Sequence, residues 1–362
     1  MMSENNIKIG TFFHHIRMAS AERKESLDET LEWLRGLGYE AAELDADDLD
    51  GAELLKDHGI AVSSIYRQYR WRDGIDEARM MEHIELAKKL GTDRIMAIPG
   101  LLSEEAWKCL DGKILGSKSE GSGESVAGCK APDYLKDAEG SEATDSLNGV
   151  SVSEAADNPN RVSVSEATDS LNGVSISEAG DSPNSVSSTG DLAQLIDRND
   201  ALGIELSLMV QGMKKLSELA KENGLTLTIE DYDDAMSPIA TIGGMKIFFD
   251  AIPDLKVAFD TGNFAFSGDD VIDAKREFIG RTRHVHLKDR LWTRTGTGDP
   301  KECPDGTLLW PCAVGDGDLP IKEILQELKA VGYNGYAMAE FFGAASYAEL
   351  IEKSIENLKM ML

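Results

Sequence analysis

Short apolar segments with strand character alternate with amphipathic helical segments along most of the chain, and this alternation restricts the fold more than any other feature. Strands are expected at Ile7–Phe13, Ala41–Leu44, Ala61–Tyr66, Arg94–Ile98, Leu225–Ile229, Lys256–Phe259, His284–Leu287 and Tyr336–Ala339. Helices are expected at Lys24–Leu37, Asp50–His58, Ile75–Leu90, Glu205–Asn223, Ile321–Val331 and Tyr347–Met361. Strands that alternate with helices in this way predict an α/β fold, a single (β/α)8 TIM barrel. A doubly wound open sheet is the alternative, and the lack of a GxGxxG after the first strand disfavours it.

Four units of twelve residues interrupt the alternation at 141–188, and they read SEATDSLNGVSV, SEAADNPNRVSV, SEATDSLNGVSI and SEAGDSPNSVSS. Units without aromatic residues bury too little apolar surface to offset the entropy of ordering them. We therefore expect 111–190 to be a disordered low-complexity insert after strand four, with a short β-solenoid as the alternative. The barrel then has its first half at 1–110 and its second half, with the candidate site, at 191–362. We interpret the insert as a tolerated loop expansion rather than a lid or docking arm.

The charge of the chain restricts its partners. The sequence has 37 Lys and Arg against 65 Asp and Glu, a net charge of −28, which would repel nucleic acid and anionic membrane surfaces. No apolar run approaches the roughly 20 residues of a membrane span, and no signal peptide is recognised. The four cysteines have no CxxC spacing and are interpreted as free thiols in a reducing compartment. We therefore expect a cytoplasmic protein.

Potential metal ligands follow four consecutive strands of the second half. Glu230, Asp260 and Glu340 end strands five, six and eight, and His286 lies on strand seven. In a barrel of parallel strands, the carboxyl ends of the strands meet at one end, here called the mouth. Three carboxylates in such a site would repel one another unless a cation held them. The sequence therefore predicts one divalent metal, Mn²⁺ first, with Mg²⁺, Co²⁺ or Zn²⁺ as alternatives.

Several further residues are expected near the mouth. Lys288 lies two positions after His286 and shares its strand face, so it is a candidate catalytic residue, unless it pairs with Asp289 instead. His14, after strand one, is a candidate catalytic residue, although the sequence does not decide between His14 and His15.

Substrate contacts are expected from residues in loops and at strand ends. Asn263 follows Asp260 by three positions, Arg67 follows strand three, and Trp310 lies in the long loop after strand seven. Glu43, on strand two, is a weaker candidate for the site, and His284 is a candidate supporting residue.

The segments TIEDYDD, AFDTGNF, HVHLKD, VGDGDLPIKEIL and YAMAEFF follow one another in this order. With them, the chain resembles the xylose-isomerase-like barrel superfamily of sugar isomerases and epimerases over nearly all of its length outside the insert. The resemblance implies a metal tetrad at Glu230, Asp260, His286 and Glu340, with proton transfer by the two glutamates. HVHLKD followed by GDG is more similar to the inosose-dehydratase and keto-sugar branches than to xylose isomerase. The large subunit of bacterial C-glycoside deglycosidases has a similar barrel.

These observations lead us to expect a metal-dependent sugar isomerase or epimerase that moves a proton next to a carbonyl through an enediolate. A lyase on a keto-sugar or keto-glycoside is the alternative within the same chemistry. A non-catalytic sugar-binding or scaffold subunit is the alternative of another class. We expect either a homo-oligomer or a hetero-oligomer with a small subunit. The related AP-endonuclease branch is disfavoured because it needs a multi-zinc cluster, whereas this chain has six histidines and is strongly acidic.

Overall fold

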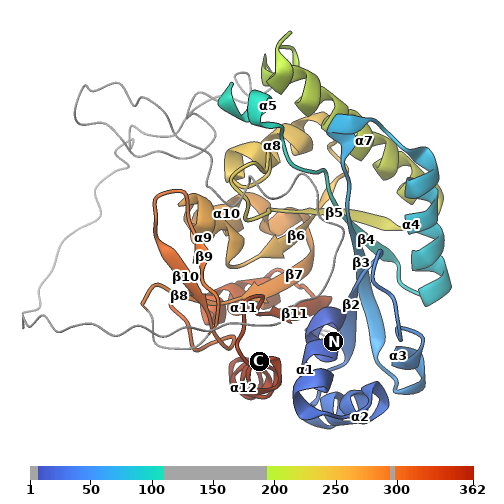
Figure 1. The fold of residues 1–362 in the computed structure, drawn as a ribbon, viewed down its shortest axis with the longest axis vertical. Helices are drawn as coiled ribbons and strands as arrows, with labels where there is room; N and C mark the ends of the chain where they lie inside the picture. Colours follow the sequence, from blue (N-terminus) through green and yellow to red (C-terminus); the bar gives the residue numbers. More distant parts are fainter. Residues whose placement is uncertain (1–6, 110–193, 294–297) are drawn as a thin grey trace, which may run out of the picture. The chain divides into compact units, whose positions relative to one another are not determined.

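The computed structural model describes residues 7–109, 194–293 and 298–362 (Figure 1). Eight parallel strands close into a barrel in the order β1-β11-β7-β6-β5-β4-β3-β2, so the predicted (β/α)8 architecture is confirmed. The expected insert and its four repeats lie outside the described residues, and the division at 110 and 190 stays a prediction.

The barrel strands coincide with the eight expected segments to within two residues at each end. Their bounds are β1 Lys8–Phe12, β2 Ala41–Asp45, β3 Ala61–Gln68, β4 Arg94–Ile98, β5 Thr226–Glu230, β6 Lys256–Asp260, β7 Thr282–Lys288 and β11 Tyr336–Glu340. The helices are α1 Phe13–Arg23, α2 Leu27–Leu37, α3 Leu54–Asp57, α4 Glu77–Leu90, α5 Glu104–Lys108, α7 Ala201–Glu222, α8 Ile242–Ala251, α9 Asn263–Ser267, α10 Val271–Phe278, α11 Ile321–Ala330 and α12 Tyr347–Met361. Short 3₁₀ helices lie at Trp71–Asp73 and Ile279–Arg281.

Side chains alternate between the barrel interior and the outer layer of helices. The large apolar cluster lies between strands and helices, whereas a small cluster of Phe12, Ala41 and Met338 lies inside. Gly10 on β1 is necessary for the interior packing, because a Cβ there would lie 2.4 Å from the terminal methyl of Met338 and 2.6 Å from the carbonyl oxygen of Ala41. Helix α12 packs against α1 (Figure 1).

The structure differs from the expectation immediately after strand one. Helix α1 begins at Phe13 and precedes α2, whereas a single helix was expected over Lys24–Leu37. No polar side chain caps the first turn of α1, so the local sequence carries no signal for its start. Helix α2, in contrast, has a capping box of Ser26 and Glu29 and ends at Gly38 in the left-handed region.

A second departure lies after strand seven. The loop expected there contains a small antiparallel sheet of three strands, β8 Arg290–Leu291, β9 Lys301–Glu302 and β10 Leu308–Pro311. Its strands have two to four residues each, which is too short to give a period-two pattern. Among the helices of the described ranges, none has the length and apolar character needed to cross a membrane.

A buried histidine of α4 gives a prediction about stability. The ring of His83 lies between the Tyr69 hydroxyl, 3.0 Å from Nδ1, and the Ile65 carbonyl oxygen, 3.0 Å from Nε2. Burial lowers the pKa of His83 to about 4 from 6.5. The unfolded chain therefore binds a proton below pH 6.5 that the folded chain does not bind until about pH 4.

The contribution of neutral His83 to stability is fully present above pH 6.5 and declines as the pH falls toward 4, by about 1 kcal/mol per pH unit. We expect the free energy of unfolding of His83→Gln to fall less between pH 7 and pH 5 than that of the unsubstituted protein. Urea unfolding at both pH values measures the difference. Equal pH dependence in the two proteins would contradict this assignment.

Candidate metal centre

The carboxyl ends of four strands bring the predicted tetrad together. Glu230 ends β5, Asp260 ends β6, His286 lies on β7 and Glu340 ends β11. One ligand atom from each of these residues lies within 4.8 Å of the others. All four residues are buried, with 5% exposure at most. Each follows a run of buried strand residues, so the hydrophobic strands place the four polar groups at the mouth.

The imidazole of His286 lies between carboxylates. Its Nδ1 hydrogen bonds to Glu230 and is 3.4 Å from Oε2 of Glu340, while its Nε2 is 2.8 Å from Oε2 of Glu43. Burial alone would lower the pKa of His286, but Glu230 and Glu43 outweigh burial and raise this pKa well above 6.5. Burial also raises the pKa of Glu230. Nδ1 of His286 is therefore the nitrogen that faces the tetrad.

Asp260 provides the test of whether these residues suit a cation. Its Oδ1 accepts hydrogen bonds from the backbone N–H groups of Gly262 and Asn263, at 2.7 and 2.6 Å. Its Oδ2 is buried and has no hydrogen-bond partner among the described residues. Burial, together with Glu340 and Glu230, raises the pKa of Asp260 to about 8. A divalent cation would stabilise the ionised form of this carboxyl group, and oxygen ligands with one imidazole suit such an ion.

Lys288 points into the same cluster. Its Nζ is 2.5 Å from Oε1 of Glu340 and 3.9 Å from Oδ2 of Asp260, and it donates a hydrogen bond to Oδ1 of Asn263. Burial alone would lower the pKa of Lys288, but the surrounding carboxylates, first among them Asp233, raise this pKa. Lys288 is therefore a buried ammonium that offsets part of the negative charge.

Asp289 does not pair with Lys288, which was the alternative considered from the sequence. Its carboxylate accepts hydrogen bonds from the backbone N–H groups of Gly315, Gly317 and Leu319. Asp289 therefore ties the VGDGDLP segment to the end of β7, while Lys288 stays free to face the tetrad.

Of the three expected substrate contacts, the structure brings Asn263 into the cluster. The amide of Asn263 is buried between Lys288 and the carbonyl oxygen of Asp231, to which it donates at 2.7 Å. Trp310 lies on β10 of the small sheet and is 9% exposed. That sheet begins at Arg290, two residues after Lys288.

Arg67 points away from the mouth. Its guanidinium lies beside α4, where it donates hydrogen bonds to the carbonyl oxygen of Arg79 and the carboxylate of Glu82, and it also pairs with Asp47. The neighbouring Tyr66 occupies the interior face of β3 and contacts Phe12. A substrate contact for Arg67 is not supported by this placement, because alternation along β3 turns it toward the outer helices.

The structure also places both histidines after strand one. The strand ends at Phe12, so the alternation of side chains along a strand does not determine where His14 and His15 point. The exposed ring of His14 stacks on Phe342, with ring centroids 5.5 Å apart. The ring of His15 is fully buried against Phe341, 4.6 Å away, and lies beside Phe12. Nε2 of His15 has no hydrogen-bond partner among the described residues. The structure therefore does not bring His14 into the cluster, and His15 lies nearer to it.

Some residues of the site were not predicted from the sequence. Asp231 is fully buried beside Glu230, and Asp233 is 3.8 Å from the Nζ of Lys288. The acidic run IEDYDD was the available signal, but the sequence does not show which of its carboxylates turn inward. Tyr66, whose hydroxyl hydrogen bonds to Asp45, also faces this end of the barrel interior.

Residues 191–361 match the family described as xylose isomerase-like TIM barrel. The second half of the chain is therefore similar to these barrels. This match confirms the resemblance inferred from the sequence, and it contains all four residues of the tetrad.

Among curated proteins, the inosose dehydratase of Clostridium perfringens is 27% identical over 164 residues. This alignment covers 43% of the present chain and 53% of the relative, so it spans about half the length of that protein.

Solved structures share the fold at low sequence identity. The IolI protein with a bound zinc atom aligns with a TM-score of 0.53 and 13% identity, over 98% of both chains. L-ribulose 3-epimerase aligns with a TM-score of 0.53 and 16% identity, over 98% of this chain and 94% of that one. At such identities the likeness establishes the barrel fold alone.

Proposed function

We propose that this protein is a divalent-metal-dependent enzyme that removes a proton next to the carbonyl group of a sugar-like substrate. The observation that carries the proposal is the buried tetrad, with three carboxylates and one imidazole within 4.8 Å of one another. Its ligands would be Glu230, Asp260, His286 and Glu340, with Mn²⁺ proposed first and Mg²⁺, Co²⁺ or Zn²⁺ as alternatives. The zinc atom in the IolI protein, which shares the fold, supports a metal but not the choice of manganese. When bound, the cation supplies positive charge where an oxyanion develops.

Glu230 and Glu340 are the groups proposed to move the proton. They lie on β5 and β11, which are separated by two strands around the barrel, so they approach the interior from different directions. One carboxylate would accept the proton from the carbon next to the carbonyl, and the other would return a proton. Lys288 would hold Glu340 in position through their 2.5 Å ion pair.

The fate of the resulting enediolate decides the reaction class. Loss of a leaving group from the neighbouring carbon gives a lyase, and the sequence relationship to inosose dehydratase favours this outcome. Return of the proton to the same or the adjacent carbon gives epimerisation or isomerisation, as first expected from the sequence. The presence of two glutamates in the cluster favours this second candidate, because epimerisation needs one group to remove the proton and another to return it.

Exchange of a carbon-bound proton with solvent tests the step that both candidates share. The protein, loaded with Mn²⁺ or Zn²⁺, would be incubated in D₂O with a panel of inososes and ketoses, and then freed of metal for proton NMR of the sugars. We expect deuterium to replace the hydrogen next to the carbonyl of at least one compound. Dehydration would appear as a product that has lost water, whereas epimerisation and isomerisation would conserve the substrate formula. Binding of sugar without any exchange would favour a non-catalytic subunit.

A further inference from the structure

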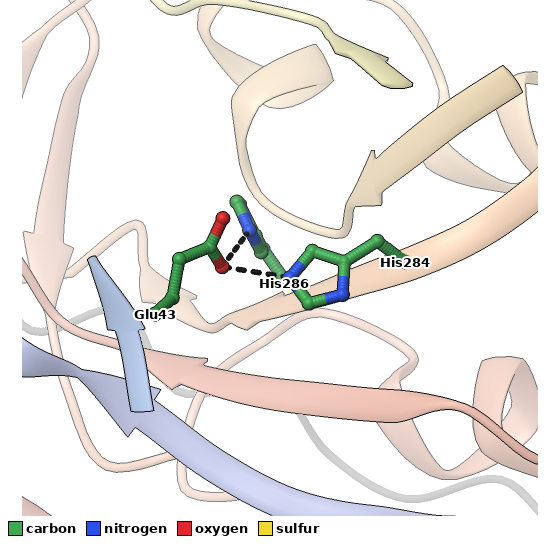
Figure 2. Close-up of side chains that lie close together, drawn as sticks. All are labelled: Glu43, His284 and His286. Atoms are coloured by element: carbon green, nitrogen blue, oxygen red, sulfur yellow. Dashed lines mark hydrogen bonds and ion pairs between the residues drawn. The ribbon is translucent and has the colours of Figure 1, made fainter. Parts of the chain in front are cut away.

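Two buried histidines, His284 and His286 of the tetrad, converge on a single carboxylate oxygen. Oε2 of Glu43 is 2.7 Å from Nε2 of His284 and 2.8 Å from Nε2 of His286 (Figure 2). All three residues are almost fully buried, with at most 1% exposure. Glu43 comes from β2 and the two histidines from β7, so this contact crosses the barrel interior.

We propose that Glu43 is a positioning residue that fixes the ring of His286 with its Nε2–H directed at Glu43 and its Nδ1 directed at Glu230 and Glu340. His284 in turn holds the Glu43 carboxylate through a second hydrogen bond to the same oxygen. This inference rests on the proposed metal site and extends it, because Glu43 and His284 are not among the four ligands.

The ring orientation of His286 follows from the partners of its two nitrogens. A carboxylate oxygen can only accept a hydrogen bond, so the nitrogen that faces Glu43 must carry a hydrogen. In the metal-free chain Nδ1 also faces a carboxylate, that of Glu230, so both nitrogens carry a hydrogen. A metal ion in the tetrad would replace the hydrogen on Nδ1, whereas Nε2 would keep the hydrogen that Glu43 accepts. Carboxylates that accept the second N–H of a ligating histidine orient the ring and increase its basicity.

A second metal among Glu43, His284 and His286 is the competing explanation, because their ligand atoms are also close together. Two features favour hydrogen bonds. The distances of 2.7 and 2.8 Å are donor–acceptor distances, and both end on one oxygen while Oε1 of Glu43 has no partner among the described residues. A metal on Nε2 of His286 would also need a lone pair that a neutral ring already gives to the tetrad.

The first test is the metal affinity of Glu43 variants, measured by competition with a chelator for Zn²⁺. Glu43→Ala removes both hydrogen bonds and should weaken binding by about 10–100-fold, with the stoichiometry still one per chain. Glu43→Gln keeps an oxygen that can accept from His286, so we expect it to recover a large part of the lost affinity. His83→Gln is the matched control, because it alters a buried histidine of α4 that hydrogen bonds to Tyr69 and Ile65 instead of the tetrad. Wild-type affinity in Glu43→Ala would overturn the proposal. A stoichiometry of two Zn²⁺ per chain in the unsubstituted protein and one in Glu43→Ala would also overturn it.

The second test observes the protonation of the His286 ring directly. In ¹⁵N-histidine NMR of the zinc-loaded protein, His286 should keep its proton on Nε2 and bind zinc through Nδ1. A proton on Nδ1 with zinc on Nε2 would overturn the proposal. If the protein binds no metal, the proposed function fails. The spectrum of the metal-free protein then tests separately whether Glu43 positions the ring of His286. In that case a slowly exchanging Nε2–H of His286 that is lost in Glu43→Ala supports the positioning by Glu43, and an unchanged signal overturns it.

Discussion

Glu230→Gln and Glu340→Gln are each expected to lower kcat by about 10²–10⁴-fold, the range for loss of a positioned proton-transfer group. An amide of nearly the same shape cannot accept the substrate proton, and it is a poorer ligand for a divalent cation. Rates would be measured at several metal concentrations, so that a deficit in bound metal is separated from a deficit in proton transfer. The deficit that remains at saturating metal reports the proton transfer.

The matched control for these two variants is Glu352→Gln. Glu352 is an exposed glutamate of α12 that accepts a hydrogen bond from the indole of Trp33. We expect its kcat to equal that of the unsubstituted protein. Retention of full activity by both Glu230→Gln and Glu340→Gln would remove the two glutamates from the mechanism.

Lys288→Met is expected to lower the free energy of unfolding of the metal-free protein by about 3–5 kcal/mol, as found when one member of a buried ion pair is removed. Without the ammonium, Asp260 and Glu340 lose the cation that lies 3.9 and 2.5 Å from their carboxylates. A divalent metal would offset the same negative charge, so saturating Zn²⁺ should reduce the loss. Urea unfolding with and without Zn²⁺ measures both effects.

Lys275→Met provides the control for this prediction. Lys275 is also buried, with 3% exposure, but its partners Glu323 and Glu327 are 55% and 46% exposed and can be hydrated when the lysine is lost. We therefore expect a smaller loss that Zn²⁺ does not change. An equal response to Zn²⁺ in the two lysine variants would show that Lys288 does not share the charge of the tetrad.

The barrel is predictable from the sequence because each strand is a short apolar run between helices with recognisable ends. Helix α2, with its capping box at Ser26 and Gly38 at its end, illustrates these signals. Helix α1 is not predicted from the sequence, because it follows β1 directly and has no capping side chain. The strand pairs of the small sheet are set by contacts across the loop, which a local pattern does not contain.

The tetrad is predictable for a different reason. Strand ends in a parallel barrel meet at one place whatever the loops do, so residues such as Glu230 and Glu340 are brought together by topology. The direction in which a side chain points, within a loop or across the barrel, cannot be predicted from topology in this way. Arg67 turns toward α4, His14 stacks on Phe342, and Glu43 reaches β7 across the interior, and each outcome depends on packing between distant segments.

Metal content decides whether the tetrad is a metal centre. Elemental analysis would be made on the purified protein, on Asp260→Ala, and on both after incubation with Mn²⁺ or Zn²⁺ and removal of unbound ion. We predict about one divalent metal per chain in the unsubstituted protein and a large loss in Asp260→Ala, because Oδ2 of Asp260 has no hydrogen-bond partner among the described residues. An unsubstituted protein that holds no metal and takes up none would contradict the proposed centre.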